Sequence, residues 1–136
     1  MDDRPPTADP DAAIRSLLGL AARVGDEGEP DDYRRLYTPD ATWTMGDTRQ
    51  VGVEQIVAAA RERRAEGVSG PGTATRHLVV PLHVDVTADS ATAVSYFLFM
   101  GDTATAPSIK LFGTYRDELV RTADGWRLRG REATLG

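Results

Sequence analysis

The spacing of apolar residues changes once along the chain, and this change restricts the possible folds more than any other feature. Near the N-terminus, Ile14, Leu17, Leu18 and Ala21 recur at helical spacing and define one apolar helix face. Over residues 76–133 the pattern becomes that of β-strands, with runs rich in valine and leucine separated by short turns. Helices followed by successive strands predict an α+β fold, in which an antiparallel sheet is covered on one face by three N-terminal helices.

Cap and turn residues divide the chain into predicted elements. Asp9 or Asp11 is a suitable N-cap for the first helix, which the glycine- and acid-rich run 25–30 ends. A short second helix is expected to begin at Asp31 and to end before Pro39, because the residue before a proline disfavours the helical conformation. The other predicted elements are a turn over residues 46–52, a third helix over 53–64, and strands over 41–45, 76–86, 91–100, 109–121 and 126–133.

Length and charge limit the class of protein. The 136 residues suit one domain over residues 11–136. Residues 1–10 carry prolines and acids, and we expect a mobile tail there rather than a signal peptide. No apolar run approaches the roughly 20 residues needed to cross a bilayer, so we expect a cytoplasmic protein with no membrane partner. The net charge of −5 disfavours nucleic acid as a partner.

Metal and thiol chemistry are disfavoured by the residue types present. The chain has no cysteine, which excludes disulfides, thiolate metal sites and cysteine nucleophiles. His77 and His83 are six residues and roughly 20 Å apart along one predicted strand, too far to share a metal ion. Pro81 between them can introduce a bulge that changes the face of the second histidine. We therefore predict no metal site; a magnesium site built from carboxylates alone has no motif to support it.

The strand predicted over residues 91–100 is apolar on both faces. Val94, Tyr96 and Leu98 lie on one side, and Phe97 and Phe99 lie on the other. A strand with one face in water alternates apolar and polar residues instead. The helices cover one face, and a second copy of the chain would cover the other, which predicts a homodimer through the outer sheet face. Alternatively, the loop after this strand or the N-terminal tail covers it.

Several polar residues allow both a structural and a functional interpretation. His77 is either a core histidine bonded to the backbone or part of a site. Asp26 ends the first helix, where a negative charge opposes the helix dipole, so it is either a solvent-facing acid or a functional carboxylate. Arg127, Arg129 and Arg131 share one strand parity. They form either a solvated face, which we favour for Arg127, or an anchor for an acidic group.

The order of several segments resembles the SnoaL-like group of the nuclear transport factor 2-like superfamily. The segments are Asp26 and residues 33–43, 52–56, 75–77, 113–117 and 124–128. The resemblance covers about residues 10–134. It implies a cone-shaped roll, in which a strongly curved antiparallel sheet wraps around the three helices and encloses a deep pocket. Members include polyketide cyclases, scytalone dehydratase-like enzymes, ketosteroid isomerases and many small-ligand binders, and dimers through the outer sheet face are common.

The resemblance also implies a site. In SnoaL-like and dehydratase-like members, an aspartate at the end of the first helix meets a histidine from the first long strand inside the pocket. Asp26 and His77 occupy those places in this chain. A carboxylate bonded to one ring nitrogen fixes the imidazole tautomer, and the other nitrogen can then act as a general acid or base.

Apolar residues on the predicted elements are candidate walls of the implied pocket. They are Leu17, Trp43, Met45, Ile56, Phe97, Phe99 and Tyr115. Such walls suit a small, flat, mostly hydrophobic ligand with a few oxygen atoms.

The chain departs from the dehydratase-like pattern at several positions. Gly25 and, approximately, Met45 stand where those members have tyrosines. Pro81 stands where many relatives have asparagine, and no second histidine pairs with His77. These differences disfavour dehydration by the arrangement that those members use.

Three functions follow as hypotheses. The first is a cofactor-free lyase, isomerase or cyclase that acts on a polyketide-, steroid- or aromatic-like substrate, with His77 as general acid or base and Asp26 as its orienting partner. The second is a non-catalytic domain that binds a small ligand in the same pocket. The third is an accessory dimeric subunit.

Overall fold

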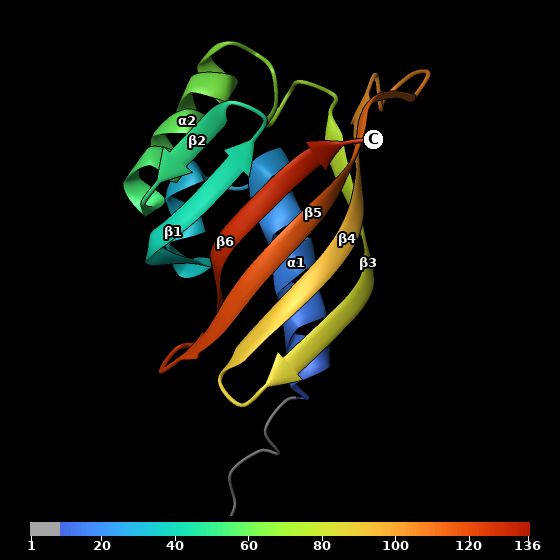
Figure 1. Ribbon diagram of the computed structural model, residues 1–136. Helices are drawn as coiled ribbons and strands as arrows, with labels where there is room; N and C mark the ends of the chain where they lie inside the picture. The colour runs from blue at the N-terminus through green and yellow to red at the C-terminus, as the bar shows by residue number, and fades with distance from the viewer. Residues whose placement is uncertain (1–8) are drawn as a thin grey trace, which may run out of the picture.

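The computed structural model describes residues 9–136, and the predicted tail over residues 1–10 lies outside them except for Asp9 and Pro10. Of the two residues predicted as the N-cap of the first helix, Asp9 and Asp11, the structure has Asp9 in that position. Three helices occur within residues 9–136: α1 (Pro10–Asp26), the 3-10 helix η1 (Pro30–Arg35) and α2 (Val53–Ala65) (Figure 1). The strands are β1 (Tyr37–Met45), β2 (Thr48–Val51), β3 (Arg76–Thr87), β4 (Ser90–Gly101), β5 (Ser108–Thr122) and β6 (Gly125–Leu135). No helix in this part of the chain is both long and apolar enough to cross a membrane.

The strands form one open sheet in the order β2-β1-β6-β5-β4-β3. β3, β4, β5 and β6 pair antiparallel with their sequence neighbours, as their short connecting turns require. β1 pairs parallel with β6, so the sheet is mixed rather than purely antiparallel. Parallel pairing is possible here because the connection from β1 to β6 is long and contains α2 and four strands.

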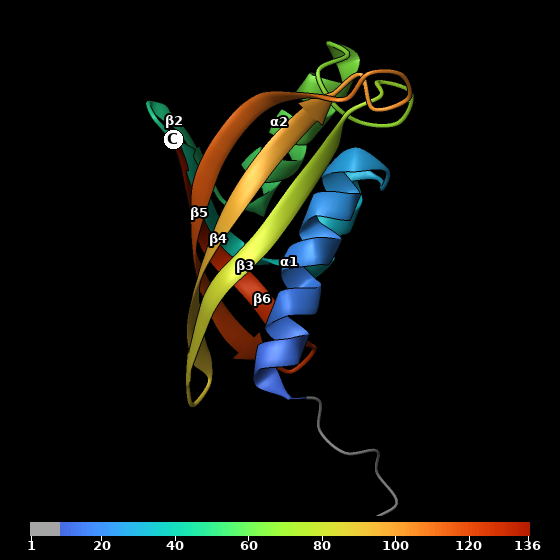
Figure 2. The same ribbon diagram turned by 90° about the vertical axis from the view of Figure 1, so that its right-hand side faces the viewer.

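The sheet curves strongly, and its concave face wraps around the helices (Figure 2). This confirms the predicted α+β cone. α1 lies along β3, while α2 packs on β1 and η1 at the other edge of the sheet. Apolar residues of the helices and the sheet meet in a principal core, where Ile14, Leu18, Val57, Leu119 and Leu128 are at most 1% exposed. Burying each such side chain fully contributes about 1.5–3 kcal/mol to the free energy of unfolding.

The second helix and the first strand differ from the prediction. η1 is a 3-10 helix capped by Glu29 rather than by Asp31, and it already ends at Arg35. β1 begins at Tyr37 and contains Pro39. The proline is tolerated because the pairing of β1 with β6 is irregular over its first residues, so the missing N–H leaves no ladder bond unmade.

The predicted turn over residues 46–52 contains a strand, β2. Gly46 adopts a φ of 58°, and Met45 and Thr48 pair across this turn, so β1 and β2 form a hairpin. β2 has only four residues and most of them are exposed. A strand this short carries no periodic apolar signal, which is why the sequence did not predict it.

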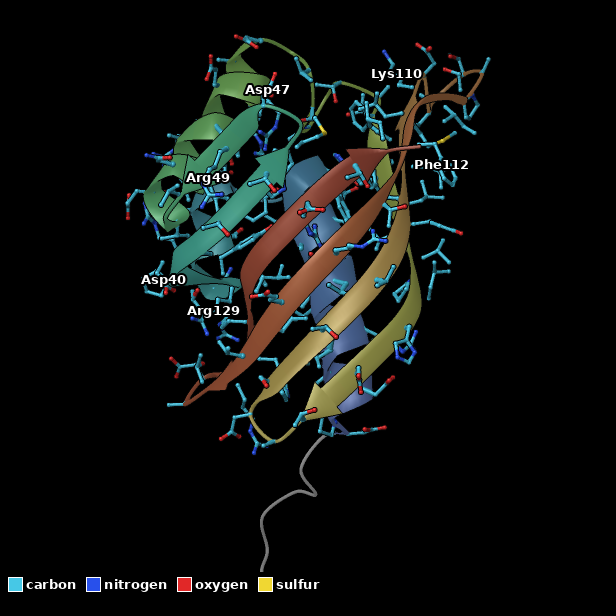
Figure 3. The ribbon with its side chains drawn as sticks, viewed as in Figure 1. Asp40, Asp47, Arg49, Lys110, Phe112 and Arg129 are labelled. Atoms are coloured by element: carbon cyan, nitrogen blue, oxygen red, sulfur yellow. The ribbon has the colours of Figure 1, made fainter. Side chains whose placement is uncertain are left out.

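Bulges in β3 and β6 change the face to which later side chains point. The register of β3 against β4 shifts between Pro81 and His83, so the bulge predicted at Pro81 is confirmed. His83 is exposed, whereas His77, before the bulge, is half-buried. In β6 the shift against β5 leaves Arg129 outside the regular pairing, and Arg129 is exposed (Figure 3). Arg131, after this bulge, is buried on the inner face.

Candidate active site

A cavity of about 290 Å³ lies between the concave face of the sheet and the last turns of α1 and α2. The larger apolar side chains of its wall are Trp43, Met45, Val68, Val79, Phe97, Phe99 and Leu111. Its polar side chains are Tyr33, Tyr37, Thr48, Gln50, Arg63, Arg64, Ser69, His77, Tyr115 and Arg131. An apolar wall with a limited set of polar groups is typical of small-molecule sites, and this volume is near the lower end of the roughly 300–1,000 Å³ that they span.

Asp26 and His77 meet at the wall of this cavity. Asp26 is the last residue of α1, and His77 is the second residue of β3, along which α1 packs. His77 Nδ1 lies 2.7 Å from Asp26 Oδ1. The backbone N–H of His77 donates to both carboxylate oxygens, at 3.1 and 2.9 Å. One buried carboxylate therefore holds both the backbone and the ring of His77.

This geometry fixes the chemistry available to the imidazole. A carboxylate can only accept, so the shared proton lies on Nδ1 and the lone pair of the neutral ring lies on Nε2. Nε2 has no hydrogen-bond partner among residues 9–136. The ring packs on Phe99 with a centroid distance of 4.7 Å, and its side chain remains 25% exposed. His77 can therefore take a proton from, or give one to, a molecule in the cavity.

Gly25 makes room for a phenol beside this pair. A Cβ atom on Gly25 would lie 2.9 Å from the hydroxyl oxygen of Tyr33 and 3.9 Å from His77 Nδ1. The Tyr33 hydroxyl has no hydrogen-bond partner among residues 9–136 and lies in the lining of the cavity. Burial raises the pKa of Tyr33, so its phenol stays protonated at neutral pH and can donate a hydrogen bond.

Arg131 and Asp117 form a buried ion pair under the cavity. Arg131 Nε and Nη2 donate to the two carboxylate oxygens of Asp117 at 2.7 and 3.0 Å. Burial acts to lower the pKa of Arg131, but the adjoining Asp117 carboxylate more than offsets it, and the guanidinium stays charged. The guanidinium carbon lies 3.9 Å from the ring centre of Tyr115, which stacks on Phe97 at 4.2 Å. The three stacked side chains, Arg131, Tyr115 and Phe97, together form one side of the cavity.

The sequence matches the family model of the SnoaL-like domain over residues 6–132. The chain belongs to the SnoaL-like domain family. No protein of curated function matches it.

Solved structures similar to this SnoaL-like domain share its fold. An NTF2-like protein with a cystatin-like fold from Novosphingobium aromaticivorans is 23% identical, with a TM-score of 0.74 over 93% of this chain and 81% of that chain. A protein of unknown function with a cystatin-like fold from Nostoc punctiforme is 15% identical, with a TM-score of 0.82 over 96% and 93%. A Catenulispora acidiphila protein in complex with S-DNPA is 20% identical, with a TM-score of 0.75 over 92% of each chain.

Five of the seven residues predicted as pocket walls line the cavity of this SnoaL-like domain. They are Trp43, Met45, Phe97, Phe99 and Tyr115.

Leu17 and Ile56 instead lie in the principal core and do not line the cavity. Each is on the expected helix face but too early along its helix. One turn later, Ala21 and Ala60 reach the cavity, and Gly25 and Arg63 follow on the same faces.

Sixteen of the 22 lining residues were not among the predicted site residues. The tyrosines and arginines among these sixteen are Tyr33, Tyr37, Arg63, Arg64 and Arg131. Tyr33 and Tyr37 are four residues apart, a spacing that predicts one helix face, but a tyrosine on an apolar face is equally typical of a core. Among residues 9–136, no group of three or more His, Asp or Glu side chains is arranged to hold a metal ion.

Proposed function

We propose that this protein is a cofactor-free enzyme that moves a proton on a small, flat, mostly apolar molecule bearing a carbonyl oxygen. The observation that carries the proposal is the 2.7 Å hydrogen bond between His77 Nδ1 and Asp26 Oδ1 at the wall of an apolar cavity. The reaction class is that of an isomerase, lyase or cyclase, and the substrate class is polyketide-, steroid- or aromatic-like.

In the proposed step, His77 Nε2 takes a proton from a carbon next to the carbonyl group. The C–H bond breaks, the proton moves to Nε2, and the electron pair moves onto the carbonyl oxygen to give an enolate. Asp26 stabilises the imidazolium that forms. The Tyr33 hydroxyl donates a hydrogen bond to the developing oxyanion. In a substrate with a C=C bond beside the acidic carbon the enolate is a dienolate, and return of the proton from His77 Nε2 to its far carbon completes an isomerisation. Alternatively, the enolate carbon attacks a second carbonyl group, a C–C bond forms, and the resulting alkoxide takes the proton back from His77 Nε2 to complete a cyclisation.

Two observations support a small-molecule ligand. The cavity combines an apolar wall with a phenol, an imidazole and guanidinium groups, which is the composition that orients an oxygen-bearing ring system. The Catenulispora acidiphila protein, which shares the fold, was solved in complex with S-DNPA.

The experiment uses 2-tetralone, a flat bicyclic ketone with an acidic CH2 group, in D2O. Deuterium incorporation is followed by mass spectrometry with the wild-type protein and two matched variants. We expect the protein to accelerate exchange, and His77→Gln to reduce that acceleration by about 100-fold. His83→Gln, which changes an exposed histidine on the same strand, should leave it unchanged. Equal rates for the two variants would show that His77 is not the base.

We also propose that the protein is a homodimer through the convex face of the sheet. Leu78, Val80, Tyr96 and Phe112 are exposed there on three adjacent strands, at 43–49% of their surface, and Tyr96 packs against Phe112 at 5.5 Å. Phe112 lies near the start of β5 (Figure 3). A two-fold axis brings the same patch of two copies together, so a second copy would remove this apolar patch from water.

A further inference from the structure

We propose that the ligand of the cavity carries an anionic oxygen group, such as a carboxylate, and that Arg63 receives this group. The proposal rests on the function proposed above and narrows its substrate class. The chemistry is that of a flat apolar ring system with one negatively charged end.

The first observation is the sign of the charges around the cavity. Of the 22 residues that line it, three are arginines and none is Asp or Glu. The whole chain has the opposite bias, with 21 acidic and 16 basic residues. An acidic protein whose cavity is lined only by basic charged side chains has a site that favours anions over cations.

The second observation is that the three arginines differ in their partners. Arg131 is neutralised by Asp117 through two hydrogen bonds. Arg64 Nη2 donates to the backbone oxygen of Val24 at 2.8 Å and so links α2 to α1. Arg63 is half-buried, its backbone oxygen accepts from the Val68 N–H at 2.9 Å, and its guanidinium makes no hydrogen bond or ion pair with any of residues 9–136. It is therefore the arginine whose donors remain available to a ligand.

The charge of Arg63 acts inside the cavity. Burial raises the pKa values of Tyr33 and Tyr115, and the positive charges of Arg63 and Arg131 act against this effect on both phenols. A guanidinium that is partly withdrawn from water and lacks a carboxylate is stabilised when an anion binds beside it. Its planar donors also suit the two oxygens of a carboxylate.

A position near the C-terminal end of a helix also favours a positive charge, because of the helix dipole. The helix dipole would favour an arginine at this end of α2 whether or not its side chain lined the cavity. Arg61, two residues earlier on α2, is exposed and pairs with Asp31 outside the cavity. Arg61 is therefore the matched control for the dipole and for net charge.

The experiment compares 2-naphthoate with 2-naphthamide, which has the same rings and a similar shape but no charge. Binding is followed by 1H–15N correlation spectra of the full chain, in which the backbone amides of Phe97, Tyr115 and Ala133 report on the cavity wall. We expect 2-naphthoate to bind more tightly than the amide. We expect Arg63→Gln to weaken 2-naphthoate binding by roughly 10-fold and leave 2-naphthamide unchanged. Arg63→Lys should retain part of the preference, and Arg61→Gln should retain all of it.

Equal affinities of the two probes in the wild-type protein would overturn the proposal, as would an Arg63→Gln variant that keeps the preference. The spectra also show directly whether each variant is folded. A preference for 2-naphthoate without deuterium exchange of 2-tetralone would leave the anion site standing and remove the proposed catalysis. Deuterium exchange of 2-tetralone without a preference for 2-naphthoate would support the proposed catalysis and remove the anion site.

Discussion

The carboxylate of Asp26 accepts a hydrogen bond from the imidazole of His77 at 2.7 Å, although 51 positions separate the two residues in the chain. The same carboxylate accepts the backbone N–H of His77, so the end of α1 and the start of β3 are fixed to each other at this point. Asp26 is only 4% exposed. The pair therefore contributes to the fold and also prepares one ring nitrogen for proton transfer.

Asp26→Asn should impair both roles. The amide cannot stabilise an imidazolium, so we expect proton exchange of 2-tetralone to slow by about 100-fold. The amide oxygen of asparagine can still accept, but the charge is lost and the NH2 group faces a His77 donor, so the free energy of unfolding should fall by about 1.5–3 kcal/mol in urea denaturation. Glu27→Gln is the control, because Glu27 is the next residue and pairs with Arg76 at the surface. Normal exchange in the Asp26→Asn variant would contradict the orienting role.

Gly25→Ala should have opposite effects on stability in two backgrounds. In the wild-type protein the new methyl group would approach the buried Tyr33 hydroxyl to 2.9 Å, and we expect a loss of about 1–3 kcal/mol in the free energy of unfolding. In a Tyr33→Phe background the hydroxyl is absent. There the better helix propensity of alanine should stabilise the protein, by up to about 1 kcal/mol. Urea denaturation of the four proteins measures the coupling, and additive effects would show that the two residues do not compete for this space.

The buried tyrosines predict a loss of stability in alkaline solution. Burial raises the pKa values of Tyr33, Tyr37 and Tyr115 above the ordinary value of 10.0. Below pH 10 both states hold the phenolic protons and stability is unaffected. Above pH 10 the unfolded chain loses these protons first, so the free energy of unfolding should fall by up to about 1.4 kcal/mol per pH unit for each tyrosine.

Tyr37→Phe tests this pH dependence. In urea denaturation between pH 9 and pH 11.5, the free energy of unfolding of the variant should fall less steeply with pH than that of the wild-type protein. The difference in slope is the contribution of the Tyr37 phenol. The same slope in both proteins would mean that Tyr37 ionises alike in the folded and unfolded states.

The convex face predicts a change of oligomeric state. Val80 is 49% exposed within the proposed dimer contact, so Val80→Glu should place two charges in an apolar interface and convert the dimer to a monomer. Sedimentation or light scattering over a range of concentrations measures the mass. Leu20→Glu is the control, because Leu20 is an equally exposed apolar residue on α1. A wild-type protein that is monomeric at all concentrations would refute the dimer.

The positions of α1 and α2, the four long strands and the Pro81 bulge could be predicted from the sequence because each depends on local spacing and turn residues. Local alternation also put Phe97 and Phe99 on the same face of their strand, and the structure shows that this face is the inner one, where they line the cavity. The face of Arg131 could not be predicted. It shares parity with Arg127 in the sequence, but the bulge at Arg129 turns Arg131 inward to Asp117. Gly130 follows the bulge and is its one local signal, but a lone glycine does not fix on which residue of the strand the bulge falls.

The sequence by itself determined the two α-helices and the four long strands, and, through a resemblance, that an aspartate and a histidine belong together. Only the tertiary structure decided how deep the core extends, so that Leu17 and Ile56 fill it while Gly25 and Arg63, on the same helix faces, reach the cavity. The reason is that helical spacing shows which face of a helix a residue lies on, but not how far along the cone it lies. Distance along the cone depends on how the helices and the curved sheet pack, and no local pattern encodes that.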